Sequence, residues 1–201
     1  ALRLDTGAFY SAETSTKLGF GSSAAMTVAL TEALFDAFAG EKSLNRRARI
    51  FRLALSAHRR AQGNLGSGVD IAASAFGGVL VYEMGYNHLA EQKLPEAADV
   101  WDELPLFAVW TGKSESTRKM VRGVGLLKKS HPDLYNSVIH DLSDLAEAGC
   151  RSYRERQQEA FLRTVSEYQN VLKKLGDESG MPIVSEEIGR ASCRERVCHR
   201  V

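Results

Sequence analysis

The sequence predicts an α+β protein with two lobes, on three observations. Several short apolar segments have the composition of β-strands. Longer stretches repeat apolar residues every three or four positions, as amphipathic helices do. An irregular stretch from Gly85 to Glu103, which contains Pro95, suggests a connection between the lobes. We therefore expect a partial N-terminal lobe over 1–86, a connection over 87–103, a partial C-terminal lobe over 104–186 and a separate tail over 187–201.

Composition describes a globular chain without an obvious macromolecular partner. Its 201 residues are 44% hydrophobic, and 26 Lys and Arg nearly balance 25 Asp and Glu. Such a balance gives no global field for nucleic acid or an anionic membrane, and no apolar run is long enough to span a bilayer. Three cysteines argue against a disulfide framework and favour a reducing compartment. We expect a cytoplasmic protein with neither nucleic acid nor membrane as partner, and its oligomeric state stays open.

The first lobe is expected to begin with a strand and a helix. Leu2 to Tyr10 alternates apolar and polar residues and predicts a strand, followed by a polar loop over 11–16. Residues 23–38 predict a helix ended by Gly40. Large apolar residues recur in it at intervals of four, which predicts a buried face made of Met26, Leu30, Leu34 and Phe38, with Ala33 and Ala37 beside them.

A second helix is expected after Ser43, which can act as its N-cap. One face would carry Leu44, Ala48, Phe51, Leu55 and His58, and its arginines would form a solvated face. His58 fits a packed or hydrogen-bonded histidine better than a ligand. A glycine-rich turn over 63–68 then leads to a short helix ending near Phe76, and 79–82 predicts a buried strand.

The second lobe is expected to contain a strand over 104–110 and three helices. The first helix covers 117–129. The second starts at Ser130 and Pro132, and a longer one follows Gly149, from Arg151 to about Leu175. Two antiparallel helices covering a sheet is the simplest arrangement.

One stretch, Lys17-Leu18-Gly19-Phe20-Gly21-Ser22-Ser23-Ala24-Ala25, predicts a phosphate cradle. The two glycines let the backbone approach a ligand closely, and the following helix directs free N–H groups and its positive dipole end at the same space. One serine can cap the helix while the other contacts a phosphate oxygen or Mg²⁺. The alternative is a tight turn without a ligand.

A second stretch, Gln62-Gly63-Asn64-Leu65-Gly66-Ser67-Gly68-Val69-Asp70, places a carboxylate on the first turn of a helix. Asp70 can orient an acceptor or metal there, or simply stabilise its own helix start. Together the two stretches resemble the Lys-x-Gly-Leu-Gly-Ser-Ser-Ala and Gly-Ser-Gly-x-Asp motifs of the GHMP small-molecule kinases, in the same order. Phe20 replaces the usual leucine. Within this superfamily the phosphomevalonate kinase family is the closest match.

The resemblance implies a two-lobed GHMP kinase fold, with a ribosomal protein S5 domain 2-like lobe and a ferredoxin-like lobe, that uses ATP and Mg²⁺. It also implies site residues. The ATP phosphates would lie against Gly19, Gly21, Ser22, Ser23 and Ala24, with Ser23 contacting Mg²⁺. Catalysis would involve Asp70 and Lys17. A third stretch, Trp110 to Thr117, resembles a family segment beside the small-molecule phosphate acceptor, so the acceptor side would comprise Ser67, Gly68, Ser114, Ser116 and Thr117, with Lys113 as a counter-charge. The alternative for this third stretch is an N-cap followed by surface residues.

The implied reaction is ATP-dependent phosphorylation of 5-phosphomevalonate to 5-diphosphomevalonate. The alternatives are another kinase of the superfamily, acting on mevalonate or a sugar, and a non-catalytic ligand sensor. Residues after about Glu186 resemble a translated sequencing adapter, so Cys193, Cys198 and His199 are not interpreted as a metal site. A genuine basic tail is the alternative. The family's N-terminal lysine strand and late glycine-rich motif have no counterpart here, which suggests truncation at both ends. Because the sheet would then lack edge strands, whether this fragment folds and is active stays open.

Overall fold

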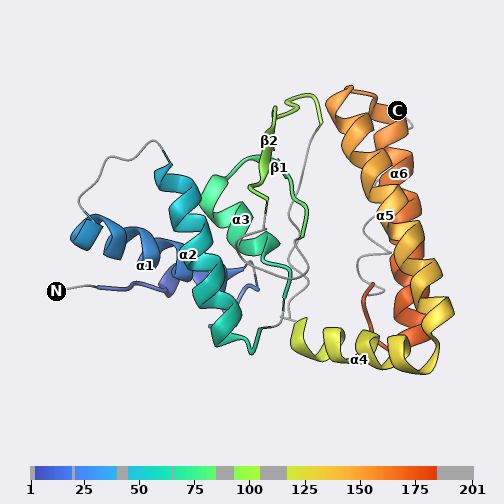
Figure 1. The fold of residues 1–201 in the computed structure, drawn as a ribbon, viewed down its shortest axis with the longest axis horizontal. Helices are drawn as coiled ribbons and strands as arrows, with labels where there is room; N and C mark the ends of the chain where they lie inside the picture. Colours follow the sequence, from blue (N-terminus) through green and yellow to red (C-terminus); the bar gives the residue numbers. More distant parts are fainter. Residues whose placement is uncertain are drawn as a thin grey trace. The chain divides into compact units, whose positions relative to one another are not determined.

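The computed structural model describes residues 3–19, 21–39, 45–64, 66–84, 93–104 and 117–184. The chain divides into two compact units, residues 1–102 and 103–201 (Figure 1). The described residues are mostly helical, and their named strands form one two-stranded sheet. The α+β expectation is therefore met in part. The expected strand over 104–110 and the expected tail after Glu186 lie outside the described residues, apart from Leu104.

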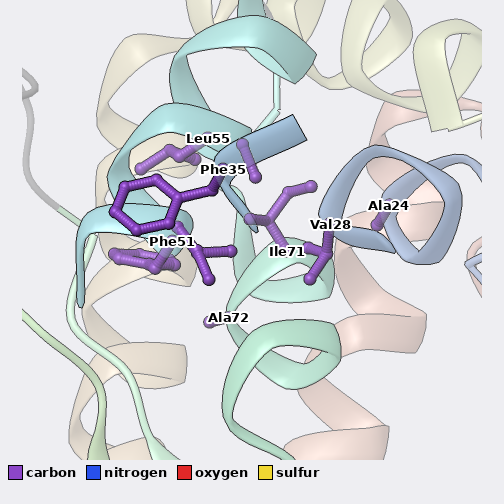
Figure 2. Packing of buried hydrophobic residues seen from close by; sticks show 9 residues of the cluster. Ala24, Val28, Phe35, Phe51, Leu55, Ile71 and Ala72 are labelled. Carbon is purple, nitrogen blue, oxygen red and sulfur yellow. The ribbon is translucent and has the colours of Figure 1, made fainter. Parts of the chain in front are cut away.

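Three helices form the core of the first unit: α1 (Ser22–Ala39), α2 (Arg46–Ala61) and α3 (Val69–Phe76). Figure 2 shows side chains from all three helices packed together. The contributors are Ala24, Val28 and Phe35 of α1, Ile50, Phe51, Ala54 and Leu55 of α2, and Ile71 and Ala72 of α3. The three helices of this unit, and the buried positions expected for Phe51, Leu55 and His58, are confirmed. The expected N-cap Ser43 is wrong, because α2 begins at Arg46 with Asn45 as its N-cap. Of the other residues expected on this face, Ala48 is half-buried and Leu44 lies outside the described residues.

The face by which α1 packs differs from the expected one. Leu34 and Phe38 are exposed, Phe38 by 85%, while Met26 and Leu30 are only half-buried. The buried face instead runs through Ala24, Val28 and Phe35. The prediction followed the largest side chains. Ala24 and Val28 are smaller, and a small side chain lets a neighbouring helix approach closely.

The expected N-terminal strand is wrong over the described residues 3–10. Gly7–Phe9 is a 3₁₀ turn (η1), started by a hydrogen bond of 2.9 Å from the Gly7 amide to Asp5 Oδ1. Tyr10 pairs with Lys17 in an isolated antiparallel bridge. An alternating pattern yields a strand only where a partner continues the ladder, and here the pairing stops after one bridge.

A short sheet closes the first unit. Strand β1 (Val79–Val81), which the sequence predicts, pairs antiparallel with β2 (Glu96–Ala98), with Val79 opposite Ala98. Strand β2 lies in the segment expected to be irregular, and that expectation is wrong at these three residues. Pro95 directly precedes β2, a position that proline tolerates because it needs no ladder donor there.

The described part of the second unit consists of three helices: α4 (Thr117–Ser130), α5 (Pro132–Arg154) and α6 (Gln158–Ser179). Pro132 occupies the first turn of α5, as expected. Helices α5 and α6 pack side by side in opposite directions (Figure 1). The core of this unit is formed by Leu127, Val138, Leu142 and Leu175.

The expected break at Gly149 is wrong, because α5 continues through it to Arg154. The chain turns at Arg156, whose φ is 55°. A Cβ at Gly149 would lie 3.6 Å from the Thr164 methyl of α6, so this glycine lies where the two helices pack closely. A single glycine costs a helix only about 1 kcal/mol, which such packing can offset.

Two glycines of α4 give a matched stability prediction. Gly125→Ala should raise the free energy of unfolding by about 0.5–1 kcal/mol, because alanine loses less backbone entropy than glycine in a helix. An added Cβ there meets no atom within 4 Å. The control is Gly123→Ala, whose Cβ would overlap Met181 and should cancel the gain. Urea unfolding measures both, and equal stabilisation by the two variants would contradict the prediction.

Candidate phosphate-binding site

The first glycine-rich loop delivers the N-terminus of α1 to the surface. Gly19 and Gly21 have φ of 79° and 70°, a region that favours glycine. The first helical hydrogen bond runs from the Ala25 amide to the Gly21 carbonyl at 3.0 Å, so the amides of residues 22–24 have no acceptor within the helix. No acidic residue occupies the first turn. The positive end of the helix dipole is therefore available to an anion.

The two adjacent serines have different environments. Ser22 is only 6% exposed, whereas Ser23 is exposed at the surface. The Ser23 Oγ lies 3.0 Å from Nε2 of His58, a buried residue of α2. The expectation that His58 is hydrogen-bonded and packed is confirmed. Its partner is the Ser23 hydroxyl, which the family resemblance places against Mg²⁺. A cation bound there would therefore share this hydroxyl with the imidazole of His58.

Two donors from different elements hold the second glycine-rich loop. Arg59 Nη2 of α2 donates to the Ser67 carbonyl oxygen at 3.1 Å, and the Tyr82 hydroxyl, just after β1, donates to the same oxygen at 2.8 Å. Gly66 and Gly68 have φ of 100° and 83°. Gly68 is buried and forms the N-cap of α3. The loop is therefore fixed on both sides immediately before Asp70.

Asp70 lies half-buried on the first turn of α3, as expected. Its Oδ1 accepts a hydrogen bond of 2.9 Å from the Ile71 amide, which supports the alternative that it stabilises its own helix start. The pKa of the Tyr82 hydroxyl is raised above its usual value, mainly by burial. The positive charge of Arg59 lowers this pKa, and the negative charge of Asp70 raises it. Asp70 therefore shares its electrostatic surroundings with Arg59 and Tyr82. A role toward a ligand stays a prediction.

The first unit brings the two loops together through shared packing. Ala24, next to Ser23, belongs to the same core as Ile71 and Ala72 of α3 (Figure 2). The Gln62 side chain, at the start of the second loop, also faces His58 Nε2, with its amide nitrogen at 3.0 Å. Both loops therefore contact the C-terminal turn of α2. A hollow shared by Ser23 and Asp70 stays a prediction.

The other expected site residues are less well placed. Lys17 is exposed and lies on the isolated bridge with Tyr10. Ser114 and Ser116, with Lys113, lie outside the described residues. Thr117 is the first residue of α4, in the second unit. Their roles beside an acceptor stay predictions.

Sequence reasoning missed the residues of α2 that support both loops. The sequence predicts a solvated face for the arginines of α2, which fits the exposed Arg47 and Arg60. However, Arg46 forms ion pairs with Glu32 and Asp36 of α1, and Arg49 lies over the Phe35 ring at 5.1 Å. The available signal was the position of Arg59 and Gln62 at the end of a helix immediately before the glycine-rich turn.

The residues present fit a phosphate-bound cation better than a protein-ligated one. Within the described residues, no three His, Cys, Asp or Glu side chains group as a metal site. Mg²⁺ in kinases is held by one or two carboxylates together with the phosphates of the nucleotide. In the two loops Asp70 offers a carboxylate and Ser23 a hydroxyl oxygen, whereas the free amides of α1 can bind phosphate but not a cation. None of the described helices is long and apolar enough to cross a membrane.

Tyr82→Phe tests the support of the second loop. Loss of the hydrogen bond to the Ser67 carbonyl should lower the free energy of unfolding by about 1 kcal/mol near neutral pH. A raised pKa in the folded state means that the neutral phenol contributes stability below the unfolded pKa of about 10, and that this contribution is lost as pH rises through the folded value. The difference between wild type and variant should therefore shrink above about pH 10. Urea unfolding across this range measures it, and a difference that grows with pH would contradict the assignment.

Comparison with known proteins finds one matching family and several similar proteins. Residues 9–78, which contain both loops, match the family described as GHMP kinases N terminal domain. The chain is 32% identical over 150 residues to mevalonate kinase ERG12 of Gibberella zeae, covering 68% of this chain and 28% of the relative. It is 32% identical over 123 residues to a phosphomevalonate kinase of Saccharolobus solfataricus, covering 61% of this chain and 36% of the relative.

A third curated relative and one solved structure are also similar to this chain. A mevalonate kinase of Thermococcus sibiricus is 31% identical over 129 residues, covering 64% of this chain and 35% of the relative. The crystal structure of a Lin0012 protein from Listeria innocua superposes with a TM-score of 0.77 at 27% identity, covering 88% of this chain and 53% of that one. The chain thus spans about a third of the length of the curated relatives. The match over residues 9–78 and the three curated relatives together support the GHMP superfamily and no single member of it.

Proposed function

We propose that this chain is part of a GHMP kinase of the mevalonate pathway that transfers a phosphoryl group from ATP to 5-phosphomevalonate. The observation that supports it most is the convergence of two glycine-rich loops on the C-terminal turn of α2. One loop ends in the free amides of α1, and the other ends in Asp70. Both lie within the residues that match the GHMP kinase N-terminal domain.

The residues divide the work of phosphoryl transfer between binding and orientation. The amides of Ser22, Ser23 and Ala24 bind phosphate oxygens at the positive end of α1. Asp70 follows the second loop, which Arg59 and Tyr82 fix by hydrogen bonds to the Ser67 carbonyl, and it orients the acceptor and any cation near it. Lys17 neutralises charge on the acceptor phosphate. MgATP supplies, when bound, the transferred group and a cation that neutralises its charge. The dianionic phosphate of phosphomevalonate needs neutralisation more than proton removal, which suits this set.

Mevalonate is the second candidate acceptor, because two of the three curated relatives described above carry the name mevalonate kinase. Its hydroxyl is a neutral nucleophile, so proton removal by Asp70 would matter more than charge neutralisation by Lys17. The two acceptors therefore predict different sensitivities. Lys17→Met should impair phosphomevalonate turnover more strongly, and Asp70→Asn should impair mevalonate turnover more strongly.

The test combines MgATP binding with ADP release. Both measurements use the full-length protein that contains this chain. Calorimetry measures its MgATP affinity, and a coupled assay measures ADP release with mevalonate, 5-phosphomevalonate and galactose. Asp70→Asn should reduce turnover at least 100-fold while MgATP affinity changes less than about threefold. The matched control is Asp133→Asn, because Asp133 occupies the same first-turn position in α5 of the other unit.

Each outcome decides between the alternatives. ADP release with phosphomevalonate alone supports the proposal, and release with mevalonate or galactose alone transfers it to the corresponding kinase. MgATP binding without turnover on any acceptor supports a ligand sensor and contradicts the kinase. Absence of MgATP binding contradicts both.

A further inference from the structure

The imidazole of His58 connects the two glycine-rich loops at one atom. Its Nε2 lies 3.0 Å from Ser23 Oγ, in the first turn of α1, and 3.0 Å from Nε2 of Gln62, at the start of the second loop. His58 is 5% exposed, so these contacts lie largely out of water, where a hydrogen bond is stronger than at the surface. Its neighbour Arg59 holds the Ser67 carbonyl of the second loop.

The identity of the partners determines where the protons lie. The Gln62 amide nitrogen is a donor only, so the tautomer that suits both neighbours has an unprotonated Nε2, whose one lone pair faces the two donors, and a ring proton on Nδ1. An unprotonated nitrogen cannot donate, so the Ser23 hydroxyl donates its proton to it. The Ser23 oxygen then keeps both lone pairs for another partner, which is what a ligand of a hard cation such as Mg²⁺ requires.

We propose that His58 is a positioning residue of the nucleotide site: by accepting the Ser23 hydroxyl proton, it orients that oxygen as a cation ligand and links it to the second loop through Gln62. The statement about the cation rests on the proposed function. The statement about the proton does not, because it concerns the chain without any ligand. The two parts therefore fail separately.

Two substitutions separate the hydrogen bond from the volume of the ring. His58→Gln places an amide oxygen near the position of Nε2 and keeps an acceptor for Ser23, whereas His58→Leu fills similar space without one. Ser23→Ala removes the partner hydroxyl at an exposed position where folding is least at risk. The matched control is His140→Leu, because His140 is an exposed histidine on α5 that pairs with Asp144.

The first readout uses the chain without ligand. Imidazole nitrogen NMR should show His58 with protonated Nδ1 and unprotonated Nε2, and Ser23→Ala should move the Nε2 resonance. None of the other four histidines should respond. A protonated Nε2, or a resonance that Ser23→Ala leaves in place, overturns the proposal whatever the protein binds.

The second readout is nucleotide affinity with and without Mg²⁺. His58→Leu and Ser23→Ala should each weaken MgATP binding about tenfold and leave binding of ATP in EDTA within about twofold. His58→Gln should stay within about threefold of wild type, and the double variant should be no worse than either single one, because both changes remove the same interaction. Equal losses in His58→Gln and His58→Leu, or additive losses, overturn the positioning role.

Failure of the proposed function gives a different pattern. If wild type shows the unprotonated Nε2 that responds to Ser23→Ala but binds no MgATP, the nucleotide assignment is wrong and the role of His58 toward a cation is overturned with it. If His58→Leu does not fold, as thermal unfolding would show, His58→Gln and Ser23→Ala decide the result.

Discussion

Phe51→Ala should lower the free energy of unfolding of the first unit by about 3–5 kcal/mol, which is the usual range for truncating a buried phenylalanine. Phe51 is 0% exposed and belongs to the core that α1, α2 and α3 form (Figure 2). Its ring meets Phe76 edge to face at 5.6 Å and Tyr82 at 6.5 Å, so the substitution also removes two aromatic contacts. Domains are stable by only about 5–15 kcal/mol, so this is a large fraction.

Urea unfolding followed by circular dichroism measures the Phe51→Ala effect. The matched control is Leu53→Ala, because Leu53 lies on the same helix and is 52% exposed. It should change the free energy of unfolding by less than about 1 kcal/mol. Similar losses in the two variants would mean that α2 does not pack by the face described here.

Gly68→Ala should lower the free energy of unfolding by about 2–4 kcal/mol for two additive reasons. Gly68 has a φ of 83°, which costs a residue with a Cβ about 1 kcal/mol. An added Cβ would also overlap Leu55 Cδ1 and lie 3.3 Å from the Tyr82 hydroxyl. Leu55 is fully buried and cannot move aside cheaply, and such overpacking costs about 1–3 kcal/mol.

The control for Gly68→Ala is Gly63→Ala, in the same loop. Gly63 has a similar φ of 71°, but a Cβ there meets no atom within 4 Å. This variant should lose only the backbone contribution of about 1 kcal/mol. Urea unfolding of both variants separates strain from steric overlap, and equal losses would contradict the close packing of Gly68 on Leu55.

Helix positions could be predicted from the sequence because they depend on local signals. Pro132 marks the start of α5, and the repeat through Phe51, Leu55 and His58 identifies the buried face of α2. The packed face of α1 could not be predicted this way, since both faces are apolar and small residues decided the contact. Strand β2 depends on a partner fifteen or more residues away, which no local pattern reports.

The candidate site was predictable as two loops but not as a connected unit. Glycine spacing and the following serines indicate a cradle, and Asp70 follows from its place after Gly68. The hydrogen bonds from His58 to Ser23 and from Arg59 to Ser67 depend on which helix faces meet. Side chains with such long-range partners look like ordinary surface or core residues in one sequence.

The pairing of Ser23 with His58 has a consequence for how such chains diverge. Two positions thirty-five residues apart share one proton, so a substitution at either changes the constraint on the other. Chains in which the serine is replaced should therefore tend to have lost the histidine as well, and those with the histidine should keep a hydroxyl opposite it. In an alignment of related sequences, the positions of Ser23 and His58 should therefore covary more strongly than those of Ser22 and His58.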